Sequence, residues 1–261
     1  MKIFTYNRTG GKIPYTEFIA ALRAVNYQIK NHFVPAWGMP ATLVYQKADG
    51  PASDPQTEDR AVLYVVREAD IEGALGYHAA NNGGTPYGFV FLDIAEQIGE
   101  PWTVTLSHEA LELIADPLTN LLAAGPHPRY PSRLVFHWLE MANAVQDSTY
   151  LINGVAVSDF VLPHYFTVDE EPKRPNRYLS TAPNLPSFGV AAGGYVGFYD
   201  PRTDGMDTYM AKGDKRAALR LKIKRGRGML GRSGGYSNLA QIIAKKGILG
   251  FLAGIRAKIK D

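Results

Sequence analysis

The chain has 261 residues, 46% of them hydrophobic and 11% aromatic, which is enough to bury a sizeable core and argues against a disordered protein. Cysteine is absent, which excludes disulfides, thiolate metal sites and a cysteine nucleophile, so any metal must take histidine, carboxylate or carbonyl ligands. The net charge of +3 is unevenly spread, because residues 1–201 carry 13 Lys and Arg against 21 Asp and Glu, whereas residues 202–261 carry 15 against 4.

The sequence also lacks the marks of membrane insertion or export. No apolar run reaches the roughly 18 residues that a membrane span requires. The first residues, M-K-I-F-T-Y-N, do not have the charged and apolar sections of a signal peptide. We therefore expect no membrane span, no signal peptide, and a protein that is cytoplasmic at synthesis.

The first half of the chain predicts a helix, three strands and a second helix. Apolar residues recur at helical spacing over residues 14–33, at the start of which a proline favours helix initiation. Strands are predicted at residues 41–46, 61–67 and 88–94, and an exposed loop rich in Pro, Asp and Ser lies between the first two. With a helix at residues 101–117, this order predicts an α+β unit with a mixed or antiparallel sheet.

The second half is less regular. Residues 118–133 contain several prolines and a glycine and predict a loop, and residues 134–146 regain order as either strand or helix. Residues 150–161 predict two short strands joined at Asn153-Gly154, a strong hairpin signal. Apolar and basic positions alternate over residues 239–259 as in an amphipathic helix.

The helix at residues 101–117 concentrates groups that can bind a metal. On a helix His108, Glu112 and Asp116 are spaced i, i+4 and i+8 and line one face. The pair His108-Glu109 matches the start of H-E-x-x-H, in which two histidines bind zinc and the glutamate is a general base. Glutamate at position 112 replaces the second histidine, and additional carboxylates favour a harder ion. The segment therefore predicts a site for zinc or another divalent metal.

Two segments, S-H-E-A-L-E-L-I-A-D-P and, some 30 residues on, L-E-M-A-N-A-V-Q-D, together resemble the core of a zincin metallopeptidase of the H-E-x-x-E type. Similar segments occur in bacterial secreted proteins and in the plant phosphate-induced, EXORDIUM-like family. The resemblance covers roughly residues 60–165 and implies a small mixed sheet. Its edge strand, expected at residues 88–94, would run beside the active helix and bind a peptide substrate by strand addition.

The resemblance also implies a role for individual residues. It implies His108, Glu112 and Glu140 as metal ligands and Glu109 as the general base. Asn143 stands where the related motif has aspartate, a position that orients a ligand. Asp116, on the ligand face of the helix, is expected in the same supporting role.

Other residues leave alternatives open at this site. His137, three residues before Glu140, is either a ligand or a packed side chain, and His78, near a glycine-rich loop, is either structural or contacts substrate. Without a metal, the buried carboxylates would need hydrogen bonds or an arginine such as Arg129 or Arg133. The remaining histidines belong to no recognisable group: His32, His127 and His164.

The domain expectation is a zincin-like domain over residues 1–167, a linker or extended arm over residues 168–201, and a basic glycine-rich tail over residues 202–261. The tail is expected to contact nucleic acid, an anionic membrane surface or acidic protein neighbours. Its predicted partner-binding residues are Lys222, Lys224, Arg225, Arg227 and Arg232.

Two functions follow from these observations. The first is a metal-dependent hydrolase, a zincin-like peptidase acting on a peptide substrate. The second is a non-catalytic zincin-like protein that forms part of an oligomer or a large assembly, for example a phage virion, and is attached through the basic tail.

Overall fold

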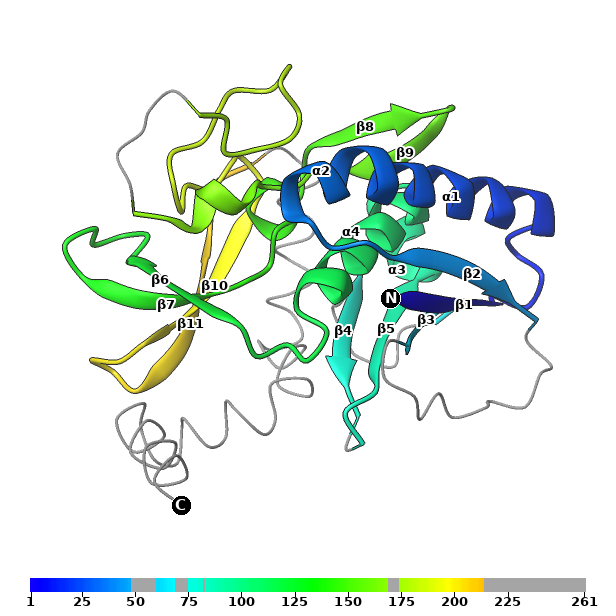
Figure 1. The fold of residues 1–261 in the computed structure, drawn as a ribbon, viewed down its shortest axis with the longest axis horizontal. Helices are drawn as coiled ribbons and strands as arrows, with labels where there is room; N and C mark the ends of the chain where they lie inside the picture. Colours follow the sequence, from blue (N-terminus) through cyan, green and yellow to red (C-terminus); the bar gives the residue numbers. More distant parts are fainter. Residues whose placement is uncertain (48–59, 69–74, 82, 169–173, 214–261) are drawn as a thin grey trace.

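The computed structural model describes residues 1–47, 60–68, 75–81, 83–168 and 174–213 (Figure 1). Over these residues the protein combines a five-stranded sheet, a four-stranded sheet, a two-stranded hairpin and several helices. The predicted α+β class is therefore confirmed. None of the helices within the described ranges is long and apolar enough to cross a membrane.

The five-stranded sheet is mixed, as predicted. Neighbouring strands run parallel except at one edge, where the last strand is antiparallel to its partner. In spatial order the strands are β2 (Thr42–Gln46), β1 (Lys2–Arg8), β3 (Arg60–Val66), β5 (Pro86–Phe91) and β4 (Gly76–Ala80).

The strand β1 was not predicted, although it lies inside the sheet between β2 and β3. Its residues alternate between Ile3 and Thr5 on one face and Phe4 and Tyr6 on the other. Because both faces carry large or weakly polar side chains, the alternation of apolar and polar residues that marks a half-buried strand is missing.

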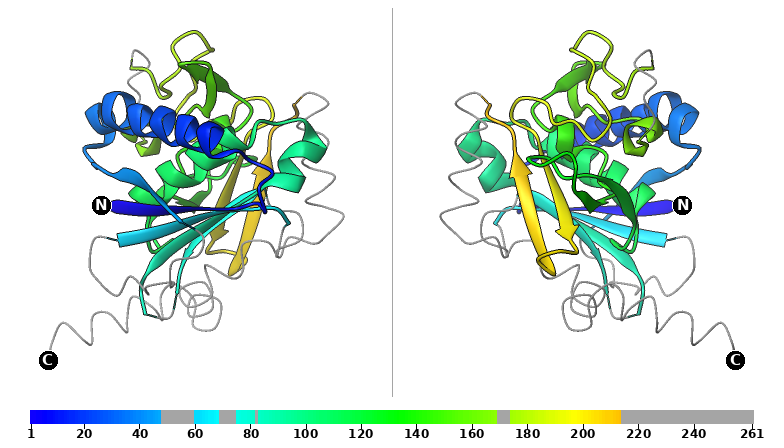
Figure 2. Two further views of the ribbon diagram at one scale, coloured as in Figure 1. Left: turned by 90° about the vertical axis from the view of Figure 1, so that its right-hand side faces the viewer. Right: turned by 90° about the vertical axis from the view of Figure 1, so that its left-hand side faces the viewer.

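Two long helices pack on the same face of this sheet (Figure 2). Helix α1 (Tyr15–Gln28) continues through a π-helical turn (Ile29–Phe33) into α2 (Val34–Trp37), and Gly38 ends it in a left-handed conformation with φ of 70°. This confirms the first predicted helix. Helix α4 (Trp102–Ala115) confirms the second.

The predicted strand at residues 88–94 is only partly correct. Strand β5 ends at Phe91, and the following residues form a short helix, α3 (Leu92–Ile98). In addition, β5 is not the edge strand, because β4 pairs with its outer side. A tight turn centred on Asn81, whose side-chain oxygen accepts the N–H groups of Gly83 and Thr85, joins β4 to β5. The glycine-rich run that resembled a loop thus closes a hairpin.

A second, antiparallel sheet lies beside the five-stranded sheet, and its strands all follow those of the first sheet in the chain (Figure 1). Its order is β11 (Gly205–Met210), β10 (Tyr195–Asp200), β7 (Leu134–Trp138) and β6 (Leu122–Pro126). The loop expected at residues 118–133 therefore contains a strand. Residues 134–146 begin as strand and end in a 3₁₀ turn (Asn143–Val145).

The hairpin expected at residues 150–161 is confirmed as β8 (Thr149–Ile152) and β9 (Val155–Ser158). Asn153 and Gly154 have φ of 50° and 82°, and positive φ at both positions is the requirement of a type I′ turn.

Residues after 167 differ from the expectation of a linker followed by a tail. Strand β10 pairs with β7, so residues 195–200 complete a sheet that begins in the first 167 residues. Arg177 is buried and binds Asp159 at 2.6 Å, and β11 falls within the expected tail. These segments therefore pack against the first 167 residues, where they bury apolar side chains and paired polar groups. The helix at residues 239–259 and the five predicted partner-binding residues lie outside the described residues.

Candidate metal centre

Helix α4 carries the site and is buried along its whole length. It begins after Pro101 and contains no glycine or proline until Pro117, which suits an uninterrupted helix. One side packs on β4 and β5 and another on β9. Two hydroxyl groups bind it to β9: Thr103 donates to the Ala156 carbonyl at 2.7 Å, and Ser107 accepts the Ser158 N–H at 2.6 Å.

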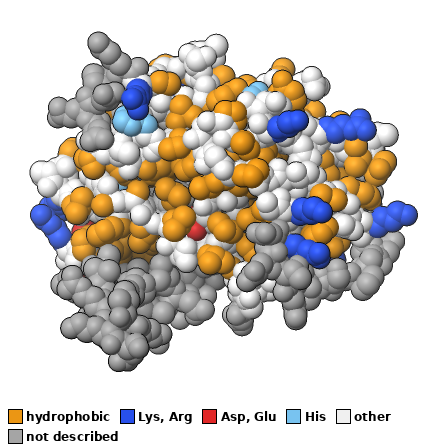
Figure 3. All heavy atoms as spheres, viewed as in Figure 1, with side chains coloured by type: hydrophobic (Ala, Val, Ile, Leu, Met, Phe, Trp, Pro, Cys, Tyr) orange, Lys and Arg blue, Asp and Glu red, His pale blue; other side chains and the backbone are white. Residues whose placement is uncertain are grey.

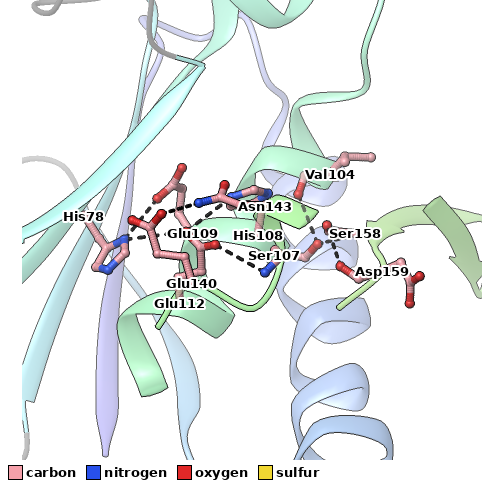
Figure 4. A network of polar contacts seen from close by, with 11 residues as sticks. His78, Val104, Ser107, His108, Glu109, Glu112, Glu140, Asn143, Ser158 and Asp159 are labelled. Atoms are coloured by element: carbon pink, nitrogen blue, oxygen red, sulfur yellow. Dashed lines mark hydrogen bonds and ion pairs between the residues drawn. The ribbon is translucent and has the colours of Figure 1, made fainter. Parts of the chain in front are cut away.

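Four ionisable side chains meet where α4 faces β4 (Figure 4). His78 Nδ1 lies 3.4 Å from Glu109 Oε2 and 3.9 Å from Glu112 Oε2. His108 Nε2 lies 3.3 Å from the same Glu112 oxygen, one helical turn away. Glu112 is therefore the carboxylate that both imidazoles face.

A glycine allows this close approach. A Cβ atom on Gly76 would lie 2.6 Å from the Phe89 carbonyl oxygen and 2.9 Å from Glu109 Cγ. A side chain at position 76 would therefore push β4 away from α4, and with it His78, two residues along the strand.

The chain after β7 closes the site from the other side. The Ala142 N–H donates to Glu112 Oε1 at 3.2 Å, which orients this carboxylate. The Asn143 amide donates to Glu140, whose carboxylate points into the same cluster (Figure 4). Asn143, predicted to orient a ligand, thus contacts Glu140, and the role of Glu140 as a metal ligand stays a prediction.

The centre gathers three carboxylates and two imidazoles, each at most 8% exposed. Burial disfavours the charged form of His78, but the hydrogen bond to Glu109 and the charges of Glu109, Glu112 and Glu140 outweigh it and raise the pKa of His78. Three carboxylates are thus held away from water beside two imidazoles, and buried charge is costly unless it is paired. Very few acidic side chains show on the face seen in Figure 3, where hydrophobic ones predominate.

The donor atoms suit a divalent cation. Two ligand atoms at about 2.0–2.1 Å from a tetrahedral zinc ion lie roughly 3.3 Å apart. The pairs His108–Glu112 at 3.3 Å and His78–Glu109 at 3.4 Å have this separation. Ligand atoms of His78, Glu109 and Glu112 all lie within 4.8 Å of one another. Within the described part of the chain, Glu112 Oε2 is buried and has no hydrogen-bond partner, although it faces both imidazoles.

The predicted ligands His108 and Glu112 are thus brought together, with Glu140 beside them (Figure 4). His78 is the member that the sequence did not single out as a ligand. In the sequence His78 lies in the segment G-Y-H-A-A, which carries no ligand motif. In the structure this segment is β4, and its pairing with β5 points His78 to the face of the sheet that carries α4.

Asp116 does not support a ligand in the way that was expected. Its two carboxylate oxygens accept the N–H groups of Asn120 at 3.0 Å and Leu121 at 2.9 Å. Burial raises the pKa of Asp116, and these two bonds oppose the rise. Because both oxygens serve backbone donors, Asp116 shapes the turn after α4.

The other candidates lie elsewhere. His137 is a packed side chain, which is one of the two roles predicted for it. Its Nε2 lies 2.9 Å from the Pro126 carbonyl oxygen, and its ring lies against Phe188. The arginines do not neutralise the centre, because Arg129 pairs with Asp207 at 3.5 Å and Arg133 lies over the Tyr130 ring. The imidazoles of the three remaining histidines have partners outside the centre, which are Tyr150 for His32, the Arg129 N–H for His127 and Thr167 for His164.

Comparison with known proteins adds no relative to these observations. No protein-family model matches the chain, and searches of curated proteins and of solved structures find no significant match.

Proposed function

We propose that the protein binds a divalent cation at Glu112 together with the imidazoles that face it, and that it is a metal-dependent peptidase with Glu109 as general base. One observation carries the proposal: the buried Glu112 Oε2 has no hydrogen-bond partner among the residues that the structure describes, and it faces His78 Nδ1 at 3.9 Å and His108 Nε2 at 3.3 Å. Histidine nitrogen and glutamate oxygen are zinc ligands, so zinc is the first candidate.

His78 also accounts for the departure from H-E-x-x-H. The motif needs a second imidazole, and in this chain position 112 is a glutamate. The imidazole that β4 contributes supplies this group from a different element. Glu140, held by Asn143, is retained as the additional carboxylate ligand that the resemblance predicts.

In the hydrolytic reaction, a bound cation would polarise the substrate carbonyl as a Lewis acid. Glu109 would accept a proton from the attacking water and deliver it to the nitrogen of the leaving amine as the C–N bond breaks. The helix face and the buried surroundings would exclude other water.

A structural cation is the second candidate, and one observation favours it. Among the described residues, His78, Glu109 and Glu112 each offer a ligand atom, and these three atoms lie within 4.8 Å of one another. This group includes Glu109, which acts as the general base in the peptidase. If Glu109 binds the cation, no carboxylate of the motif is left to accept a proton. The cation would then tie α4 to β4 and serve the fold.

Metal analysis of the purified full-length chain tests the proposal. After chelation and reconstitution with zinc, we expect one zinc per chain in the wild type and in the surface control Glu96→Gln, whose side chain is 54% exposed. We expect substoichiometric zinc in His78→Ala and Glu112→Gln. Absence of stoichiometric metal from the wild type, or its retention in both variants, would overturn the proposal.

Glu109→Gln separates the two candidates. In the peptidase it leaves zinc binding nearly intact and removes hydrolysis of a casein or peptide-library substrate, because a general base contributes about 10²–10⁴-fold. With a structural cation, the same change weakens zinc binding, and neither the wild type nor the variant hydrolyses the substrate.

The assembly function remains a prediction that concerns the basic tail. Lys222, Lys224, Arg225, Arg227 and Arg232 all fall outside the described residues. Deleting residues 225–261 tests it: an assembly component that no longer incorporates but remains folded supports attachment through the tail. A shortened chain that still incorporates contradicts it.

A further inference from the structure

The five-stranded sheet has a second face, turned away from α1 and α4 (Figure 2). The strand register assigns its residues, because alternate positions point to opposite faces. Seven aromatic side chains point to this face of the sheet, which we name the aromatic face: Phe4, Tyr6, Tyr64, Tyr77, Tyr87, Phe89 and Phe91. Three cations lie among the same alternating positions: Lys2, Arg8 and Arg60.

The aromatic rings form a continuous row across four strands. Ring centroids are 5.2 Å apart for Tyr6 and Tyr64, 5.1 Å for Tyr64 and Phe89, and 5.3 Å for Phe89 and Tyr77. The ring planes of these pairs are inclined by 26° to 29°, an offset-stacked arrangement. The row therefore follows one direction across the sheet, from β1 through β3 and β5 to β4.

Positive charge lies beside the rings. The Arg8 guanidinium is 4.8 Å from the Tyr64 ring centroid, and the Arg60 guanidinium is 5.6 Å from that of Phe4. All three cations are exposed and five of the seven rings are partly exposed, whereas Tyr6 and Phe91 are buried. Among the residues that strands β1 to β5 contribute to this face, none is acidic.

We propose that the aromatic face binds single-stranded nucleic acid, with bases stacking on the partly exposed rings of the row and phosphates meeting Lys2, Arg8 and Arg60. Single strands are bound in this way, by aromatic side chains beside a positively charged track, because every base has a π-face and every linkage a negative charge. The proposal does not rest on the metal centre, because His78 points to the opposite face of the sheet.

Charge complementarity selects this occupant over the others. The chain's own C-terminal region is strongly basic, with 15 Lys and Arg against 4 Asp and Glu over residues 202–261, so it repels the cations of the face. A duplex offers phosphates but keeps its bases paired inside. An acidic peptide would pair with the cations but leave the aromatic row without planar partners.

Binding of a fluorescein-labelled oligothymidylate of about 20 nucleotides to the full-length chain, measured by fluorescence anisotropy, tests the proposal; this length exceeds the site size of one such surface. Tyr64→Leu removes the central ring of the row, and Arg8→Gln removes an exposed cation. The matched controls are Tyr15→Leu, on α1 and 61% exposed, and Arg23→Gln, also exposed on α1.

We expect Tyr64→Leu to raise the Kd by about tenfold, as loss of one stacking partner does. Arg8→Gln should reduce the slope of log Kd against log salt by about 0.7, the value for one phosphate contact on a single strand. Both controls should match the wild type, and the same oligonucleotide annealed to its complement should bind more weakly. An oligouridylate probe shows whether RNA or DNA is preferred.

Three results would overturn the proposal: no binding by the wild type, equal binding of single strand and duplex, or the same Kd and salt slope in both face variants and both controls. The last result would assign binding to the basic tail. Thermal unfolding monitors the fold of each variant. If Tyr64→Leu is destabilised, the test relies on Arg8→Gln, because Arg8 is exposed. The slope of log Kd against log salt in this variant then decides whether the aromatic face binds the oligonucleotide.

Discussion

Zinc addition to the chelated protein gives the sharpest prediction, because it tests the centre through the stability of the whole fold. The perturbation is Glu112→Gln, which has nearly the same shape. The glutamine oxygen can still accept the Ala142 N–H, now bound at 3.2 Å, so this loop contact is kept. The change removes the negative charge that faces His78 and His108.

The expected magnitude follows from linkage between binding and folding. A ligand that binds only the folded protein stabilises it by about 2.7 kcal/mol when its free concentration is 100 times its Kd. For a protein of about this size, 1 kcal/mol shifts the Tm by roughly 2–4 °C. Zinc at that concentration should therefore raise the Tm of the wild type by about 5–10 °C.

Differential scanning fluorimetry or calorimetry with and without zinc measures this shift. Glu96→Gln makes the same chemical change on the exposed surface of α3 and should keep the full shift. Glu112→Gln should lose most of it. An equal zinc shift in Glu112→Gln and the wild type would refute the assignment of Glu112 as the central ligand.

Three further predictions concern the surrounding structure. Arg177→Met should lower the free energy of unfolding in urea by about 3–5 kcal/mol, because it leaves the buried Asp159 carboxylate without its ion pair; adding Asp159→Asn should recover part of the loss, and no recovery would contradict this account. Gly76→Ala should cost about 1–3 kcal/mol in the same assay and weaken zinc binding, because its Cβ would lie 2.6 Å from the Phe89 carbonyl oxygen on β5 and 2.9 Å from Glu109 Cγ on α4; unchanged zinc affinity would show that β4 need not approach α4 closely. Burial lowers the pKa of His137 to about 4, so the folded state keeps it neutral where the unfolded state is protonated. Its contribution to stability is present above pH 6.5 and is lost as the pH falls towards 4, by up to about 3 kcal/mol; a difference between wild type and His137→Gln that does not change with pH would contradict this.

The motif on α4 could be predicted because its geometry is local. Residues four apart on a helix lie on one face whatever the helix packs against. A helix at this segment therefore places His108 and Glu112 next to each other. The hairpin at Asn153-Gly154 was predictable for a similar reason, since the turn needs positive φ at two adjacent residues.

The contribution of β4 could not be predicted in this way. His78 is 31 residues from Glu109, and the two meet only because β4 pairs with β5 and lies against α4. No local spacing encodes that pairing. The turn at Asn81 resembles a flexible glycine-rich loop in sequence, and only its hydrogen bonds show that it closes a hairpin.

The sequence by itself determined the α+β class, the two long helices and the half of the candidate metal centre that α4 carries, because helical periodicity and turn chemistry act over a few residues. The tertiary structure alone decided that β1 lies inside the sheet, that residues 195–200 complete a second sheet, and that His78 joins the centre. These outcomes depend on which distant segments bury their surfaces together, and that choice is made by the packing of the whole chain.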